Sequence, residues 1–139
     1  MQIAFEIEGE PVAKGRPRLN RNGHVFTPRK THLYENFVRV KAKEAMRGKE
    51  PLSRPVAITL TAFFGIPKSW SKKKKAAADM GPHAKKPDLD NVVKAVVDGM
   101  NGIVFEDDSL VFQVTAKKIY STQARVEVVI EEKGGEIEK

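Results

Sequence analysis

Several segments of the chain alternate apolar and polar residues, as half-buried strands do. In residues 2–8, Ile3, Phe5 and Ile7 alternate with polar or small residues, and this period of two predicts a strand. Four further segments are predicted to be strands because they alternate in the same way or form a short apolar run: residues 58–64, 103–105, 114–120 and 126–130.

Two other stretches have the period of a helix. Apolar residues follow helical spacing from Tyr34 to Met46, and Thr27-Pro28 supplies an N-cap and first-turn pair, which predicts a helix over residues 28–47. A second helix begins near Leu89 and ends at Asn101-Gly102. Its apolar stripe consists of Leu89, Val92, Val93, Val96, Val97 and Met100. The opposite face, within an arc of about 100°, carries Asp90, Asn91, Lys94, Asp98 and Asn101. One face is therefore expected to pack and the other to remain available for chemistry.

The two long links between these elements lack periodicity. Residues 11–30 are expected to form a basic loop, ordered but mobile, and residues 65–86 a link with one short helix after Ser71. With 139 residues, the chain predicts a small single domain of mixed α+β (α/β) class. Its sheet would have four to five strands packed with two main helices. The domain would span residues 1–133, and residues 134–139 would be a flexible tail.

Charge is distributed unevenly along this basic chain, whose net charge is +7. Residues 1–86 carry 19 Lys and Arg against 7 Asp and Glu, whereas residues 87–139 carry 6 against 11. The positive field attracts nucleic acid or anionic lipid, and charge alone does not separate these partners. It favours polyanions over acidic proteins.

The residue types that are absent narrow the chemistry. The chain has no cysteine, which removes disulfides and thiolate ligands and leaves carboxylates, which suit Mg²⁺, Mn²⁺ or Ca²⁺ rather than zinc. Charged residues occupy the N-terminal region where a signal peptide would need an apolar run, and no stretch approaches membrane-spanning length. We expect a cytoplasmic protein without membrane contact.

Asp88 and Asp90, at the start of the second helix, allow two interpretations. Aspartate at a helix start commonly caps backbone N–H groups and interacts favourably with the helix dipole. However, only one residue can be the N-cap, and adding Asp107 and Asp108 from a separate turn would assemble like charges whose repulsion a cation offsets. The combination favours a metal site.

Lys94 lies one helical turn after Asp90, about 6 Å along the axis. An ion pair with Asp90 would contribute only about 0.2–0.5 kcal/mol. The alternative is that Lys94 holds a scissile phosphate or stabilises charge developing on it, and its position beside two acids favours this role. Asp98 is expected to support Lys94 through an ion pair. Of Asp107 and Asp108, an extended chain would direct only one towards the site, and periodicity does not say which.

Four motifs together resemble the signature of the RusA-type Holliday-junction resolvases: Lys86-Pro87-Asp88-Leu89-Asp90-Asn91, Lys94, Asp98-Gly99 and Val104-Phe105-Glu106-Asp107-Asp108-Ser109. The resemblance implies a small mixed α/β fold, a homodimer, and cleavage of branched DNA, such as four-way junctions, with Mg²⁺, for which Mn²⁺ is expected to substitute. It also implies roles for individual residues. Asp88, Asp90 and Asp108 would be the catalytic, metal-binding carboxylates and Lys94 the catalytic lysine, with Asp107, Asp98 and Asn91 in supporting positions.

Basic residues outside this signature are candidates for DNA contact. Lys14, Arg16 and Arg18 alternate in a segment stiffened by Pro17, so they can reach phosphates together without reading sequence. The run of lysines at residues 72–75 is either a solvated helix face or a DNA contact, and Trp70 before it either closes the edge of the core or stacks on a base. The candidate DNA-binding residues are Lys14, Arg16, Arg18, Arg21, Lys72, Lys73, Lys74, Lys75 and Lys86.

The function that this combination predicts is magnesium-dependent, structure-selective DNA cleavage. Such an endonuclease would resolve Holliday junctions by paired phosphodiester hydrolysis in DNA recombination and repair. Two alternatives remain open. One is a less selective nuclease acting on flaps or forks, and the other is a noncatalytic basic DNA-binding protein whose acids cap a helix and pair with lysines.

Overall fold

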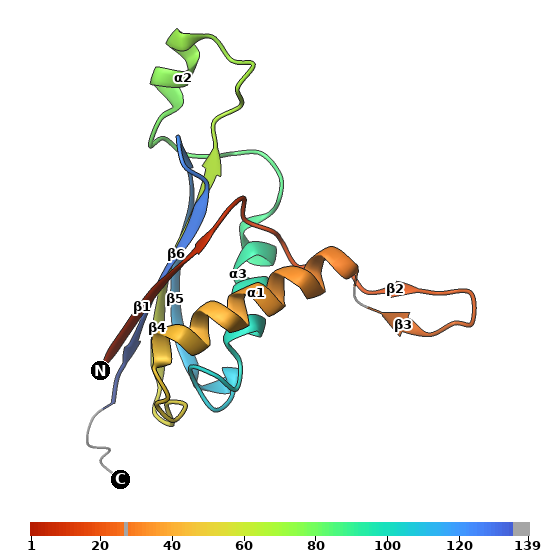
Figure 1. Cartoon of the computed structure of the whole chain (residues 1–139), viewed down its shortest axis with the longest axis vertical. Coiled ribbons are helices and arrows are strands. Elements are labelled where there is room, and N and C mark those ends of the chain that lie inside the picture. The colour runs from red at the N-terminus through yellow and green to blue at the C-terminus, as the bar shows by residue number, and fades with distance from the viewer. Residues whose placement is uncertain (27, 135–139) are drawn as a thin grey trace.

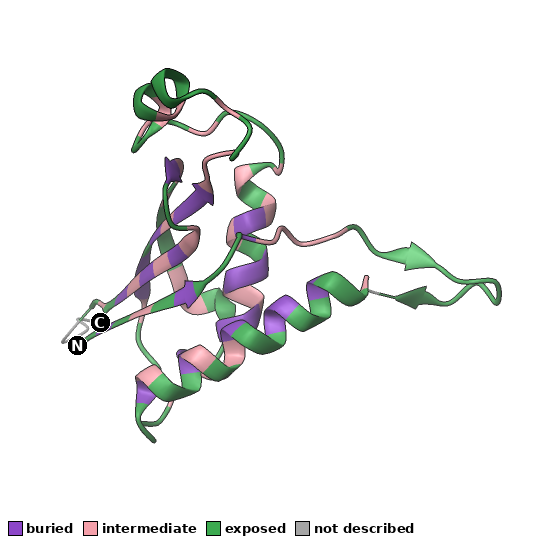
Figure 2. Cartoon of the chain, turned by 45° about the horizontal axis from the view of Figure 1, so that its top comes forward, coloured by how far each residue is buried: buried purple, intermediate pink, exposed green. Residues whose placement is uncertain are grey.

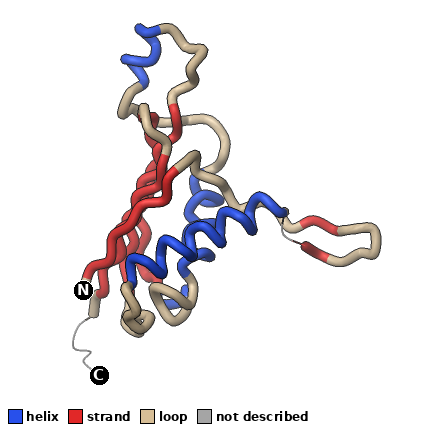
Figure 3. Tube along the Cα trace, in the orientation of Figure 1, coloured by secondary structure: helices blue, strands red, loops and turns tan. Residues whose placement is uncertain are grey.

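A four-stranded mixed sheet carries two long helices on one of its faces (Figures 1 and 3). The computed structural model describes residues 1–26 and 28–134. The sheet has the order β1-β6-β4-β5 and consists of β1 (Gln2–Glu8), β4 (Val56–Gly65), β5 (Val111–Ser121) and β6 (Arg125–Glu132). The helices are α1 (Arg29–Met46), the short α2 (Lys72–Ala78) and α3 (Leu89–Met100), and a 3₁₀ turn at Asp108–Leu110 precedes β5. The mixed α+β fold confirms the predicted class.

The period-two pattern explains why only one face of the sheet is covered. β6 pairs antiparallel with β1 and β4, and β4 pairs parallel with β5. Ile3, Ile130 and Ile58 lie side by side in this register and are buried under the helices, whereas the row containing Glu6 and Glu127 belongs to the other face. Figure 2 shows the buried residues gathered between the sheet and the two helices. This layer is the hydrophobic core.

Helix α3 packs through a slightly different stripe from the one predicted. Its buried residues are Val92, Ala95, Val96, Gly99 and Met100, while Leu89, Val93 and Val97 are only partly buried. The reason is the close crossing of α1, because a Cβ built on Gly99 would lie 2.7 Å from the Cβ of Val38. The small residues on this side of α3 therefore let the two helices approach, and the helix face rotates towards them.

Two expectations for the irregular segments were wrong. Residues 103–105 form no strand but a buried turn, in which the N–H of Gly102, at φ 81°, donates to the carbonyl of Phe105 over 2.9 Å. Val104 and Phe105 fill the core there, and Phe105 pairs with Leu52 and Asn101 only through isolated bridges rather than along a strand. The basic loop contains a two-stranded hairpin, β2 (Arg18–Leu19) and β3 (Val25–Phe26), which projects beyond the start of α1 (Figure 1).

Two predictions fall wholly or partly outside the described residues. One is the N-cap role of Thr27, although the helix that it was expected to start does begin at Arg29, after Pro28. The other is the tail, of which residues 135–139 are not described. Among the residues that are described, no helix is both long enough and apolar enough to cross a membrane.

Lys14 ties the segment after β1 to both long helices. Its ammonium Nζ lies 2.6 Å from Oε2 of Glu35 on α1 and 3.1 Å from Oδ2 of Asp98 on α3. Its backbone N–H donates to the carbonyl of Asn91 over 2.8 Å. The side chains of Lys14 and Glu35 are only 22% and 11% exposed, so this ion pair is poorly screened by water. It joins three segments that are far apart in sequence.

The next residue continues this attachment. The N–H of Gly15 donates to Oγ1 of Thr31 over 2.9 Å. A Cβ at Gly15 would lie 2.9 Å from Cγ of Pro28 and 3.0 Å from that same hydroxyl. Any other residue would therefore push the segment away from α1.

The environment of Lys14 keeps it charged. Burial, the largest influence, would lower the pKa of Lys14, but the hydrogen bonds and charges of Glu35 and Asp98 together raise it above the ordinary value of 10.5. A raised pKa means that the stabilisation is complete below that ordinary value and is lost only as the pH rises through the folded-state pKa. The contribution is therefore constant across neutral pH.

We expect Lys14→Met to lower the free energy of unfolding by about 1–3 kcal/mol, because it leaves a buried carboxylate without its partner. The loss should be the same at pH 7 and pH 9, and adding Glu35→Gln should restore part of it. Urea denaturation measures the free energy of unfolding of the Lys14→Met variant at both pH values and of the double variant. Lys49→Met, at an exposed loop residue, is the control and should change the stability by less than about 0.5 kcal/mol. Equal stability of the Lys14 and Lys49 variants would contradict the structural role of the pair.

Candidate active site at the start of helix α3

Asp88 occupies the N-cap position of α3 without acting as a cap. Its backbone is extended, at φ −68° and ψ 142°, and its side chain makes no capping hydrogen bond. Asp90, in the first turn, accepts a hydrogen bond at Oδ1 only from the N–H of the next residue, Asn91, over 2.9 Å. Both residues are exposed, and their Cα atoms are at most about 7 Å apart. Capping, the simpler interpretation of Asp88, therefore has no support in its geometry.

An open hollow lies beside Asp88. It is lined by Arg16, Lys86, Pro87, Asp88 and Asn91. Arg16 comes from the segment that Lys14 ties to the helices, while Lys86 comes from the link before α3. Two cations and one carboxylate thus face the same space, where an anionic ligand and a metal ion could lie together.

Lys94 is an exposed charged group on this face of α3. Its side chain is 60% exposed, and Nζ lies 3.8 Å from Oδ1 of Asp98. The predicted Lys94–Asp98 ion pair is thereby confirmed, although it is long, and the same carboxylate has a closer partner in Lys14. In the described part of the chain no ion pair joins Lys94 to Asp90. Lys94 is therefore free to turn towards a ligand.

Asp107 and Asp108 lie at the far end of α3 from Asp88. The twelve residues of α3 span about 18 Å at 1.5 Å per residue. The length of β5 gives a similar separation. Lys118 of β5 contacts the carbonyl of Pro87, next to Asp88. Asp108 precedes the first residue of β5, which lies seven residues or about 23 Å from Lys118. Figure 1 shows the two ends of α3 at opposite ends of the helix layer. The carboxylates expected to share one site do not converge within one chain.

The local contacts of these two acids differ. Asp107 caps the 3₁₀ turn, since its Oδ2 accepts from the N–H of Ser109 over 2.9 Å. Hydrogen bonds from the side chain and backbone of Ser109 hold the pKa of Asp107 below its ordinary value. Asp108 is exposed within the turn.

The residues at the start of α3 fit a magnesium ion only in part. Among residues 1–26 and 28–134, no group of three or more His, Asp or Glu side chains is arranged to hold a metal. Mg²⁺, however, is usually bound through one or two carboxylates, with water and substrate phosphate completing the octahedron. Asp88, whose side chain makes no capping hydrogen bond, and the neighbouring Asp90 supply two such carboxylates.

The candidate DNA-binding residues fall into four groups, of which one, Arg16 and Lys86, lines the hollow beside Asp88. Lys14 is engaged in ion pairs, so the expectation that it projects with Arg16 and Arg18 was wrong, because the nearby acids of α1 and α3 hold it inwards. Arg18 and Arg21 are exposed on the hairpin. The lysines of α2 lie in a separate lobe above the sheet (Figure 1): Lys72, Lys73 and Lys74 are exposed and Lys75 is partly buried.

Trp70 is half-buried and packs against Tyr120 beside that lobe. Its ring tilts against Tyr120 with centroids 5.4 Å apart, and Nζ of Lys74 lies 4.1 Å from its ring. His83 adjoins the same cluster, stacked on Phe64 at 4.0 Å. These contacts favour the packing interpretation of Trp70 over base stacking.

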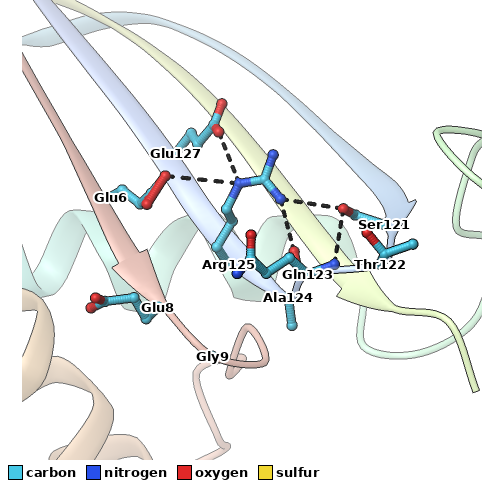
Figure 4. Close-up of a pocket in the computed structure, with 9 residues that line it drawn as sticks. All are labelled: Glu6, Glu8, Gly9, Ser121, Thr122, Gln123, Ala124, Arg125 and Glu127. Atoms are coloured by element: carbon cyan, nitrogen blue, oxygen red, sulfur yellow. Dashed lines mark hydrogen bonds and ion pairs between the residues drawn. The ribbon is translucent and has the colours of Figure 1, made fainter.

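A second hollow, near the β5–β6 turn on the open face of the sheet, holds none of the predicted site residues (Figure 4). At its centre, Arg125 contacts Glu127 and Glu6 at 2.9 and 3.8 Å, and it donates to Ser121 Oγ and the Gln123 carbonyl. On the other side its guanidinium lies 3.9 Å from the ring centroid of Phe63. Since these contacts occupy the guanidinium, this hollow is a structural feature of the turn.

Two residues of the site region were missed by the sequence analysis. Glu35 carries a weak signal, because it is the only acid between residues 11 and 43 and lies on the buried face of α1. Lys118 carries none, since its partners are backbone carbonyls of a distant loop. Both bear on the position of α3 or of the residues before it.

Comparison with known proteins agrees with the motifs along this helix. The family model for endodeoxyribonuclease RusA matches residues 8–131. The chain is 40% identical over 137 residues to the uncharacterized protein YqaN of Bacillus subtilis (strain 168), covering 94% of this chain and 96% of that protein. It is 26% identical over 140 residues to the crossover junction endodeoxyribonuclease rusA of Lactococcus phage r1t, covering 94% and 97%. The chain belongs to the endodeoxyribonuclease RusA family.

Proposed function

We propose that this protein is a magnesium-dependent endonuclease that resolves four-way DNA junctions. The observation that carries the proposal is the carboxylate of Asp88, which makes no capping hydrogen bond to the helix and shares a hollow with Arg16 and Lys86. A carboxylate left free at a helix start, between cations that attract phosphate, suits a metal-assisted phosphoryl reaction better than a structural cap. Family membership and the name of the phage relative support the same activity.

The residues of this chain divide the chemistry between them. Asp88 and Asp90 would hold Mg²⁺, which when bound would polarise the scissile phosphate and activate the attacking water. Lys94 would approach a phosphate oxygen and stabilise the charge that develops there. Asp98 lies between Lys14 and Lys94, 3.1 and 3.8 Å from their Nζ atoms, and would hold the Lys94 side chain near the site. Arg16 and Lys86 would hold the flanking DNA backbone.

Asp108 requires a second copy of the chain if it serves the same ion. Asp108 follows the end of α3 opposite to Asp88, and α3 is about 18 Å long, which rotation of side chains does not span. In a symmetric dimer, Asp108 of one copy could complete the site of the other. Such a dimer would also place two identical sites in the two-fold relation that paired incisions of a junction need.

The principal rival is a noncatalytic DNA-binding protein, which the separation of the three carboxylates within one chain favours. A less selective flap or fork nuclease is the rival among enzymes. Incubation of the purified protein with a four-way junction, a flap and a linear duplex, with and without Mg²⁺, separates all three. Magnesium-dependent cleavage of the junction alone supports the proposal, whereas binding without cleavage in the presence of Mg²⁺ would reject it.

We expect Asp88→Asn, Asp90→Asn and Asp108→Asn each to abolish cleavage while leaving junction binding equal or tighter. Each change removes a negative charge that repels phosphate and a ligand or positioning group of the reaction. Asp107→Asn, which alters a local cap, is the matched control and should retain most activity. Cleavage assays beside gel-shift titrations measure both properties. Wild-type turnover by Asp88→Asn would refute the assignment.

Mixing two inactive variants tests whether the sites are shared between copies. In a dimer of Asp90→Asn with Asp108→Asn, a shared arrangement regenerates one intact site, whereas sites contained within one chain remain broken. We therefore expect the mixture to nick a supercoiled cruciform plasmid to open circles. Asp88→Asn mixed with Asp90→Asn is the control. Both residues belong to the half of the site at the start of α3, so each of the two sites contains one change and the mixture should stay inactive. No nicking by the first mixture would remove Asp108 of the second copy from the mechanism.

The hairpin arginines provide a test of the DNA-binding surface. Replacing Arg18 and Arg21 with Gln should weaken junction binding equally for different sequences and reduce the salt dependence of the affinity by roughly 0.9 per lost phosphate contact. Arg47→Gln is the control, because Arg47 is exposed at the other end of α1, about 27 Å from the hairpin end. Filter binding between 50 and 200 mM salt, roughly the range over which such contacts change affinity most, measures the slope. An unchanged slope would leave the hairpin without a role in binding.

A further inference from the structure

Lys118 of the edge strand β5 makes two short hydrogen bonds to the loop that precedes Asp88. Its Nζ donates to the carbonyl of Lys85 over 2.6 Å and to the carbonyl of Pro87 over 2.7 Å. Hydrogen bonds from a charged donor are among the stronger ones in proteins. A single ammonium therefore holds two carbonyls, two residues apart, against the sheet.

The same loop is attached to β5 by its backbone only as far as residue 83. The N–H of Met80 donates to the carbonyl of Tyr120, the N–H of Tyr120 to Gly81, and the N–H of His83 to Lys118, over 2.9, 2.9 and 3.1 Å. Beyond His83 the chain leaves the strand to reach α3. The side chain of Lys118 takes over where these backbone bonds end.

The carbonyl of Pro87 fixes the backbone of the next residue. It belongs to the same planar peptide unit as the nitrogen and Cα of Asp88. On its other side, Asp88 is held by the first bonds of α3, in which its carbonyl accepts from Asn91 and Val92 over 3.2 Å. Lys118 thus fixes the one flank of Asp88 that the helix leaves free, while the carboxylate itself makes no capping bond.

We propose that Lys118 is a positioning residue of the nuclease site, which orients Asp88 for metal binding through the carbonyls of Lys85 and Pro87. This inference rests on the proposed function. Lys118 does not contact the reacting atoms, and its effect passes through one peptide plane. Mutation of groups that hydrogen-bond to a metal ligand and orient it typically lowers metal affinity or activity by about 10- to 100-fold, and we expect an effect of that order here.

The neighbouring Lys117 provides a matched control. It lies on the same strand, paired with Thr61, and alternation directs it to the open face of the sheet, away from Asp88. It is exposed. Lys117→Met removes the same charge from the same strand without touching the loop.

The test compares Lys118→Met, Lys118→Arg and Lys117→Met with the wild type. Mn²⁺ binding is followed by electron paramagnetic resonance, junction affinity is measured in EDTA, and kcat and KM are measured with Mg²⁺. For Lys118→Met we expect Mn²⁺ affinity and kcat to fall by about 10- to 100-fold, with junction affinity unchanged. Lys118→Arg, which keeps several donors, should recover most of the loss, and Lys117→Met should match the wild type.

Three outcomes would overturn the inference. Wild-type Mn²⁺ affinity and kcat in Lys118→Met would show that Asp88 needs no such support. A loss of junction affinity and salt dependence with unchanged Mn²⁺ binding would make Lys118 a DNA contact instead. A wild-type protein that neither binds Mn²⁺ nor cuts junctions would reject the proposed function and this inference together, which distinguishes that failure from the first two.

Stability is checked with a second variant. If Lys118→Met lowers the melting temperature more than Lys117→Met does, Lys118→Gln replaces it, since its amide still donates hydrogen bonds but is too short to reach both carbonyls. The Mn²⁺ affinity of this variant should still fall, and amide hydrogen exchange should accelerate at residues 86–91 and not in β6. Unchanged exchange and Mn²⁺ affinity in Lys118→Gln would count against the inference.

Discussion

The ion pairs of Lys14 with Glu35 and Asp98 are the constraint on which the arrangement of the site depends. They join the segment after β1 to both long helices, α1 and α3. Arg16, two residues on, is thereby brought to the hollow beside Asp88. Removing one member of such a buried pair costs much more than an exposed pair contributes, because the remaining charge stays desolvated. Lys14 is therefore held in place by acids rather than kept free for DNA.

The position of the acids along α3 is the second constraint. Asp88 and Asp90 lie at its start, Asp98 near its end, and Asp107 and Asp108 beyond it. Their contacts differ: Asp98 forms ion pairs with lysines, Asp107 caps a turn, and Asp88 makes no capping hydrogen bond. The acidic part of the sequence is thus several local environments rather than one cluster. Asp88, at the start of α3, lines the hollow together with two cations, Arg16 and Lys86.

The parts of the structure that local periodicity decides were predictable. The sheet strands with clear alternation and α3 with its Asn101-Gly102 end were found where expected, since a repeated pattern reports which face is buried. The hairpin was missed because strands of two residues have no period. The partners of Lys14 and Lys118 were missed because contacts between distant segments leave no local signal. The separation of Asp88 from Asp108 was already contained in the length of the predicted helix, but treating the acids as one group obscured it.

The lobe that carries α2 begins and ends at adjacent residues of β5. The N–H of Ile66 donates to the carbonyl of Ser121, and the N–H of Met80 donates to that of Tyr120. A surface excursion whose two ends are neighbours can change length at little entropic cost, about 0.6 kcal/mol for each doubling. The sheet and the start of α3 would be unaffected by such a change. This lobe is thus a place where proteins of the same architecture can gain, lose or exchange a lysine-rich surface while the sheet and the start of α3 stay the same.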